Sequence, residues 1–197
     1  MKNVLLLLAL FSITLLFSCG DDDGPPDENE EEIIDLVTLT FTPTGGGNAI
    51  VVTATDPDGE GVMDMAPDAA IELASSTAYD LSIEFENTEE GEDITMEVQE
   101  EGAEHMIFFG FTADIFSNPA GDGNVDARAD AVNYNDQDIN GQEIGLSTSW
   151  TTGSASTGGS FRIILKHQPD VKTATSGSSD GDTDVDIAWT INISDPS

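Results

Sequence analysis

The stretch that decides the fold is Leu36-Val37-Thr38-Leu39-Thr40-Phe41-Thr42, in which apolar side chains alternate with threonines. Alternation with a period of two is typical of a β-strand that buries one face and exposes the other. The turn Gly45-Gly46-Gly47-Asn48 follows, and Ile50-Val51-Val52-Thr53-Ala54-Thr55 provides a second candidate strand. Together these runs predict two strands separated by a glycine-rich turn.

Comparable runs recur along the rest of the chain, separated by Gly, Asp, Asn, Ser and Pro, which are turn-forming residues. We expect further strands at 79–86, 105–112, 128–135, 144–151, 160–167 and 185–194. About eight short strands with this spacing predict an immunoglobulin-like antiparallel β-sandwich. Its core is expected to hold the large aromatic side chains Phe41, Phe85, Phe109, Phe111, Trp150, Phe161 and Trp189.

One segment, 92–101, does not follow the β pattern. It is rich in helix-forming residues, with Ile94 and Val98 four positions apart and acidic residues in its first turn. This segment predicts a short helix between strands, and Gly102 interrupts the acidic helix near its end.

The composition is strongly acidic. The chain has 197 residues, with 5 Lys and Arg against 39 Asp and Glu, and a formal net charge of −34 at pH 7. This charge excludes an electrostatic nucleic-acid binder, because neutralising phosphates requires clustered Lys and Arg. Self-repulsion on this scale destabilises a compact state unless cations bind or screen the carboxylates.

The first eighteen residues have the pattern of an export signal. Met1-Lys2-Asn3 is a short basic start, and the apolar run 4–17 follows it. As a helix this run would rise roughly 21 Å, less than the roughly 30 Å of a bilayer's hydrocarbon core. Residues 1–18 are therefore interpreted as a signal peptide rather than a permanent membrane span.

The residues that follow indicate the type of signal. Leu16-Phe17-Ser18-Cys19 ends in the only cysteine of the chain and resembles the lipobox of bacterial lipoproteins. The resemblance implies that Cys19 receives a diacylglycerol and becomes the new N-terminus, so that lipid attaches the protein to a membrane. The alternative is an ordinary secretory signal with an incidental cysteine.

The segment 19–32 is acidic and contains prolines, so we expect an extended tether. An acidic run behind a lipidated cysteine also resembles the surface-export signal of Bacteroidota outer-membrane lipoproteins. That resemblance implies a lipid-anchored, surface-exposed protein of the cell outer membrane. A plain spacer that leaves the domain facing the periplasm is the alternative. Residues 33–197 are then the β-sandwich domain.

The domain itself is similar to small flavobacterial-type surface lipoproteins. The similarity is carried by Glu104-His105-Met106-Ile107-Phe108-Phe109, by Leu165-Lys166-His167-Gln168-Pro169 and by an acidic final strand over 182–194. It implies a surface binding role, with an outer-membrane uptake receptor of the TonB-dependent class as partner.

Two loops have the residue spacing of a calcium-binding loop. Asp56, Asp58 and Glu60 form one set of oxygen donors before a glycine, and Asp136, Asp138 and Asn140 form the other. Alternate oxygen-bearing residues followed by Gly are what a Ca²⁺ loop requires, but both loops lack its distal bidentate Glu. The alternative is that Asp, Asn and Gly serve here only to form tight turns.

A transition-metal site is the second candidate. The only two histidines, His105 and His167, are expected on strands, and Glu101 and Glu104 lie close to His105 in sequence. Imidazole and carboxylate groups suit Zn²⁺, iron or copper. The alternative is a pair of hydrogen-bonded structural histidines.

No sequence motif of a known catalytic site appears, and the chain is not expected to be an enzyme. We therefore predict a non-catalytic surface binding module that assists ligand or metal uptake. A calcium-stabilised structural or adhesive module is the alternative, and a hydrolase would require a carboxylate pair that the sequence does not identify.

Overall fold

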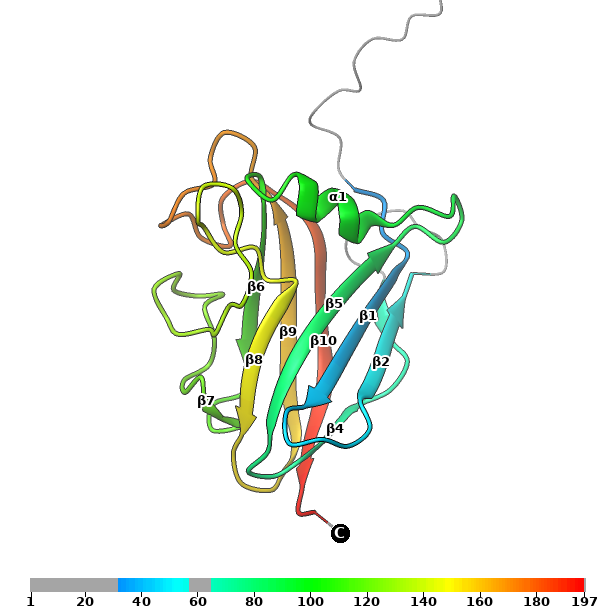
Figure 1. Cartoon of the computed structure of the whole chain (residues 1–197), viewed down its shortest axis with the longest axis vertical. Helices are drawn as coiled ribbons and strands as arrows, with labels where there is room; N and C mark the ends of the chain where they lie inside the picture. The colour runs from blue at the N-terminus through cyan, green and yellow to red at the C-terminus, as the bar shows by residue number, and fades with distance from the viewer. Residues whose placement is uncertain (1–31, 57–64, 197) are drawn as a thin grey trace, which may run out of the picture. The chain divides into compact units, whose positions relative to one another are not determined.

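The computed structural model describes residues 32–56 and 65–196, and in this part of the chain it has ten strands and one short helix (Figure 1). Their order is β1 (Leu36–Pro43), β2 (Ile50–Thr55), β3 (Ala66–Pro67), β4 (Ile71–Ala74), β5 (Ala78–Glu86), α1 (Ile94–Glu100), β6 (His105–Phe111), β7 (Phe116–Asn118), β8 (Ser147–Thr152), β9 (Ser156–His167) and β10 (Asp182–Ser194). The predicted signal peptide, Cys19 and the tether up to residue 31 lie outside the described residues, as do Asp58 and Glu60.

The strands form two curled sheets. One has the order β3-β2-β1-β5-β8-β7, and the other has the order β4-β10-β9-β6. Neighbouring strands pair antiparallel, except that β4 and β10 run parallel. The prediction of a mostly β domain with one short helix is confirmed.

The core lies between the two sheets and follows the alternation seen in the sequence. In β1, Val37, Leu39 and Phe41 are fully buried, whereas Thr38 and Thr40 are half-buried on the other face. All seven aromatic side chains expected in the core are buried. The ring of Trp150 packs against four phenylalanine rings, with centroids 4.7–5.4 Å apart: Phe109, Phe111, Phe116 and Phe161. Each large apolar side chain buried in this way contributes roughly 1.5–3 kcal/mol.

The helix is where the sequence placed it, at Ile94–Glu100, and it buries Ile94 and Val98. Gly102 lies just beyond its end. A Cβ at that position would lie 2.6 Å from Cδ1 of Ile144, so the Ile144 side chain would have to shift to admit a larger residue. In Figure 1, α1 crosses one end of the domain. Among the described residues, no helix is long and apolar enough to cross a membrane.

The strand expected at 128–135 is a wrong prediction. This segment forms only an isolated bridge between Tyr134 and Thr148. Its backbone bonds to β8 only next to this bridge, from the Asn135 amide to the Ser147 carbonyl and from the Ser149 amide to the Asn133 carbonyl. The Tyr134 hydroxyl donates to the Ile107 carbonyl and accepts from Asn124. With Val125, Tyr134 covers the second apolar face of β6 and β9, where Met106, Phe108 and Ile164 are buried. Three short strands, β3, β4 and β7, were not expected. With these three gained and the strand at 128–135 lost, the structure has ten strands where about eight were predicted.

Candidate metal centre

The end of α1, the start of β6 and the end of β9 meet at one end of the domain. His105 is the first residue of β6, His167 is the last residue of β9, and Glu101 follows the last residue of α1. Because β6 and β9 are antiparallel, their register places His105 directly opposite His167. The short turn 101–104 then carries Glu101 back over the two histidines, and the Glu104 carbonyl accepts a hydrogen bond from the Gln168 amide.

The three side chains predicted as transition-metal ligands do come together. Each of Glu101, His105 and His167 offers one ligand atom, and these atoms lie within 4.8 Å of one another. The two imidazole rings stack in parallel, with centroids 4.6 Å apart and planes 4° from parallel. His105 is 0% exposed and His167 is 3% exposed, whereas Glu101 is exposed. The arrangement therefore places a carboxylate at the solvent side of two buried rings.

The protein fixes the orientation of His105 through one of its two ring nitrogens. Nδ1 lies 3.3 Å from the Glu101 carbonyl oxygen, which can only accept a hydrogen bond, so Nδ1 carries the proton. Burial, and then the neighbouring His167, lower the pKa of His105 from 6.5 to about 4. The ring is therefore neutral at pH 7, and its Nε2 holds a free lone pair. A backbone carbonyl on Nδ1 with a free Nε2 is the arrangement that metal-binding histidines commonly adopt.

Both histidines present a buried Nε2 atom that has no hydrogen-bond partner. Buried polar atoms are nearly always paired, and leaving one unpaired costs about 1–3 kcal/mol. The nearest charged groups are carboxylates: Glu32 is 4.0 Å from Nε2 of His105, and Glu104 is 3.6 Å from Nε2 of His167. These distances are too long for hydrogen bonds. A metal ion at these nitrogens would remove the cost of burying them unpaired.

The carboxylates on this side are crowded. Burial, followed by the charge of Glu97 and a hydrogen bond with it, raises the pKa of Glu32 from 4.5 to about 7. Glu101 and Glu92 raise the pKa of Glu32 further. A divalent cation would lower this mutual repulsion as well as occupy the two imidazole nitrogens.

Coordination of one ion by both rings requires a local movement. Zn²⁺ ligands lie about 2.0–2.2 Å from the ion, so two of its ligand atoms are at most about 4.4 Å apart. The lone pair of an imidazole nitrogen lies in the ring plane, and the two rings are parallel. One ring must therefore turn about its side-chain torsions to share an ion with the other.

The predicted calcium loop at 136–141 uses its carboxylates differently. Asp136 accepts hydrogen bonds from the amides of Gly145 and Ser147, and Asp138 accepts them from the amides of Asn140 and Gln142. The second oxygen of Asp138 contacts the Lys172 ammonium at 3.0 Å. The Asp-Gln-Asp-Ile-Asn-Gly pattern thus has a turn-forming use in this structure.

In the other predicted calcium loop, Asp56 is the only one of the three donor residues that lies in the described part of the chain. Its side chain is buried, and its amide donates to the Asp35 carbonyl.

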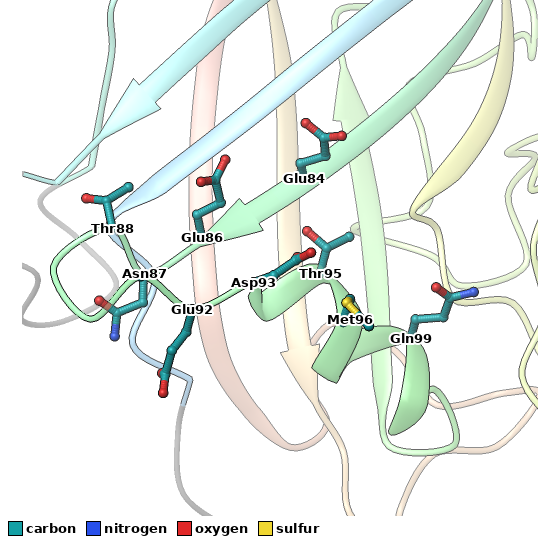
Figure 2. Close-up of a pocket in the computed structure, with 10 residues that line it drawn as sticks. Glu84, Glu86, Asn87, Thr88, Glu92, Asp93, Thr95, Met96 and Gln99 are labelled. Atoms are coloured by element: carbon teal, nitrogen blue, oxygen red, sulfur yellow. The ribbon is translucent and has the colours of Figure 1, made fainter.

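A separate acidic hollow of about 560 Å³ lies beside α1. Figure 2 shows its lining side chains, which come from the end of β5, the following turn and α1. Glu84, Glu86, Glu92 and Asp93 contribute its carboxylates. Among these described lining residues, none has a buried side-chain atom without a hydrogen-bond partner. The histidine pair therefore has the stronger chemical reason to bind a ligand.

Sequence reasoning identified Glu101, His105 and His167 but missed Glu32 and Lys172. Lys172 donates to the Gly102 carbonyl as well as to Asp138, and so holds the turn that leads from α1 to His105. Both residues are far in sequence from the groups they contact, and no local pattern marks them. Comparison of the chain with protein-family models, with curated proteins and with solved structures gave no match.

The Lys172–Asp138 pair yields a test of what supports this end of the domain. Both side chains are 1% exposed, and removing one partner of a buried pair typically costs about 3–5 kcal/mol. Lys172→Met should therefore lower the free energy of unfolding by about 3 kcal/mol, measured by urea denaturation with tryptophan fluorescence. Adding Asp138→Asn should recover part of this loss, because it removes the uncompensated carboxylate. A loss below about 1 kcal/mol in Lys172→Met would contradict this role.

The pKa of His105 yields a test of its burial in the metal-free protein. Below pH 6.5 the unfolded chain binds a proton at this residue, and the folded protein does not until about pH 4. Stability from His105 is therefore present above pH 6.5 and is lost as the pH falls towards 4, by up to about 1.4 kcal/mol per pH unit. Glu32 acts in the opposite direction, because its raised pKa makes the folded state lose stability as the pH rises from 4.5 to about 7.

The difference between the wild-type protein and His105→Gln isolates the first effect, since Glu32 is present in both. Their difference in unfolding free energy, measured in urea with EDTA present, should shrink as the pH is lowered from 6.5 to 4. The variant Glu100→Gln, which changes an exposed residue of α1, should retain the wild-type profile. Parallel curves for the wild-type protein and His105→Gln over this range would show that His105 titrates normally.

Proposed function

We propose that this protein is a lipid-anchored, surface-exposed lipoprotein of a bacterial outer membrane, and that its β domain binds a transition-metal ion such as Zn²⁺ through Glu101, His105 and His167. In this proposal it is a non-catalytic binding module that assists metal uptake by an outer-membrane receptor. The observation that carries the metal-binding part is the pair of buried imidazoles, each with an unpartnered Nε2, beside the Glu101 carboxylate.

The donor set favours a transition metal over calcium. Imidazole nitrogen with carboxylate oxygen suits Zn²⁺, Cu²⁺ and Fe²⁺, whereas Ca²⁺ takes six to eight oxygen ligands. His105 is neutral at pH 7, so the domain need not release a proton from this ring on binding. A purely structural role would leave both Nε2 atoms buried without a hydrogen-bond partner in the described part of the chain.

The location is supported by the sequence. An apolar run behind a basic start, a lipobox-like Leu16-Phe17-Ser18-Cys19 and the acidic stretch 20–32 form the order expected of a lipoprotein signal, lipidation site and tether. Two curled sheets that pack across one core are consistent with an immunoglobulin-like sandwich, although the parallel pairing of β4 with β10 departs from a purely antiparallel one.

Metal binding is tested by titrating Zn²⁺ into the protein, purified in detergent from cells that express the full chain, with calorimetry as the readout. We expect one ion per chain, and a dissociation constant that rises at least about 100-fold in His105→Ala and in His167→Ala, because each variant removes a ligand. Glu100→Gln is the matched control for loss of one nearby charge, and Ca²⁺ should not compete. Failure of the wild-type protein to bind Zn²⁺, Cu²⁺ or Fe²⁺ would overturn this function.

The anchor is tested separately with Cys19→Ser. The thiol is the group that would carry the diacylglycerol, so the variant should lack the lipid mass in intact-protein mass spectrometry and should leave the membrane fraction. Ser18→Ala, which keeps a small residue before the cysteine, should behave as the wild-type protein does. If Cys19→Ser stays in the envelope with unchanged processing, the lipoprotein assignment is wrong.

A further inference from the structure

Glu32 is a further carboxylate close to the histidine pair. It precedes β1, and its Oε1 is 4.0 Å from Nε2 of His105. The Glu32 side chain is 13% exposed and that of His105 is 0% exposed, so water has little access to the space between them. On the basis of the proposed metal-binding function, we propose that Glu32 is a fourth protein ligand of the ion, so that metal binding ties the segment before β1 to the corner formed by α1 and β6.

The distance between the two atoms is closer to that of two ligands on one ion than to that of a hydrogen bond. A nitrogen and an oxygen at 4.0 Å are too far apart for a hydrogen bond. Two ligands of one tetrahedral Zn²⁺ ion are about 3.3–3.6 Å apart, given metal–ligand distances of about 2.0–2.2 Å. The Glu32 oxygen and the His105 nitrogen, at 4.0 Å, would have to approach each other by about 0.4–0.7 Å to share such an ion. Glu104 lies 3.6 Å from Nε2 of His167, but its side chain is 38% exposed, whereas that of Glu32 is 13% exposed.

The tautomer of His105 leads to the same assignment. Its Nδ1 proton is directed to the Glu101 carbonyl, so the nitrogen that faces Glu32 has a lone pair and no proton. A lone pair opposite an ionised carboxylate oxygen is electrostatically unfavourable unless a proton or a metal ion lies between them. Among the described residues, His105 is the only basic group that the structure places within ion-pair distance of Glu32.

Other acidic groups add to the need for a cation. Glu97 is hydrogen-bonded to Glu32, and Glu101 and Glu92 interact with it through their charge. Glu97 belongs to α1, Glu101 follows the last residue of α1, and Glu92 lies in the turn before it. Three carboxylates near α1 therefore act on Glu32. Acidic clusters alone are common on a protein of net charge −34. The buried, unpartnered Nε2 of His105 distinguishes this cluster from the others.

Four ligands of this kind, two imidazoles and two carboxylates, would complete the tetrahedral set of a structural Zn²⁺ site. They also have a mechanical consequence. Glu32 ends the acidic stretch that the sequence predicts as a tether, so an ion held by Glu32 and His105 would join the base of the tether to the domain.

The test compares Glu32→Gln with Glu100→Gln in the full-chain protein in detergent, by calorimetric titration with Zn²⁺. Both variants remove one carboxylate near the site, but only Glu32 faces His105. We expect Glu32→Gln to weaken Zn²⁺ binding at least about tenfold more than Glu100→Gln does. X-ray absorption of the Zn²⁺-loaded proteins should show two nitrogen and two oxygen ligands from the wild-type protein, and the loss of one carboxylate oxygen in Glu32→Gln.

Folding of the variant is checked without metal. Glu32→Gln relieves repulsion among carboxylates, so its urea midpoint in EDTA should equal or exceed that of the wild-type protein. If the wild-type protein binds Zn²⁺ and Glu32→Gln binds it as tightly as Glu100→Gln does, Glu32 is not a ligand and only this inference is overturned. If the wild-type protein binds no transition metal, the proposed function fails and this inference fails with it.

Discussion

The register between β6 and β9 is the constraint on which the candidate site depends. Seven residue pairs, from His105 opposite His167 to Phe111 opposite Phe161, are fixed along these strands. Alternate members, including Phe109 and Ile163, face the core between the two sheets. Because side chains alternate with a period of two, a slip of one residue would move this apolar set to the other face of the sheet. The packing of the core therefore also determines that the two imidazoles stack on each other.

Charge imposes a second constraint, because the domain has few basic side chains and each of them already bonds to groups of the domain itself. Arg128 pairs with Glu143, Arg162 with Asp186, and Lys172 with Asp138. Lys166 donates to the Gly181 carbonyl and the Thr183 hydroxyl. These four side chains offset only a small part of the negative charge of the 39 Asp and Glu residues. The carboxylates around His105 and His167 thus have little protein cation to balance them, and a bound metal ion would supply charge where the chain lacks it.

Much of the fold could be predicted because its signals are local. Alternation over 36–42 gave β1, and helix-forming residues around Ile94 and Val98 gave α1. The same rule failed at 128–135, where Tyr134 bonds to the Ile107 carbonyl and the segment covers another strand instead of joining a sheet. Three-dimensional packing decided that outcome, and its cause lies outside the segment. The two-residue strand β3 is too short for alternation to identify.

The candidate site, like the fold, could be predicted from the sequence only in part. Glu101 and His105 could be connected because they are four residues apart, and His167 was added only because it is the other histidine. Their meeting required the strand register, and the contact of Glu32 with His105 spans more than seventy positions, so no local pattern could predict it.

The acidic surroundings and the two imidazoles have different effects on cation binding. A large negative charge raises the local concentration of every cation, including Ca²⁺ and Mg²⁺, so it contributes affinity without selectivity. Neutral imidazole nitrogens are poor ligands for those hard ions and good ligands for Zn²⁺ or Cu²⁺. Burial keeps His105 neutral down to about pH 4, so protons compete weakly for this nitrogen. Any ion that binds only the folded state also stabilises the fold, by about 2.7 kcal/mol at a hundredfold excess over its dissociation constant. In a domain that repels itself, selective metal binding and stability of the fold would therefore come from the same few contacts.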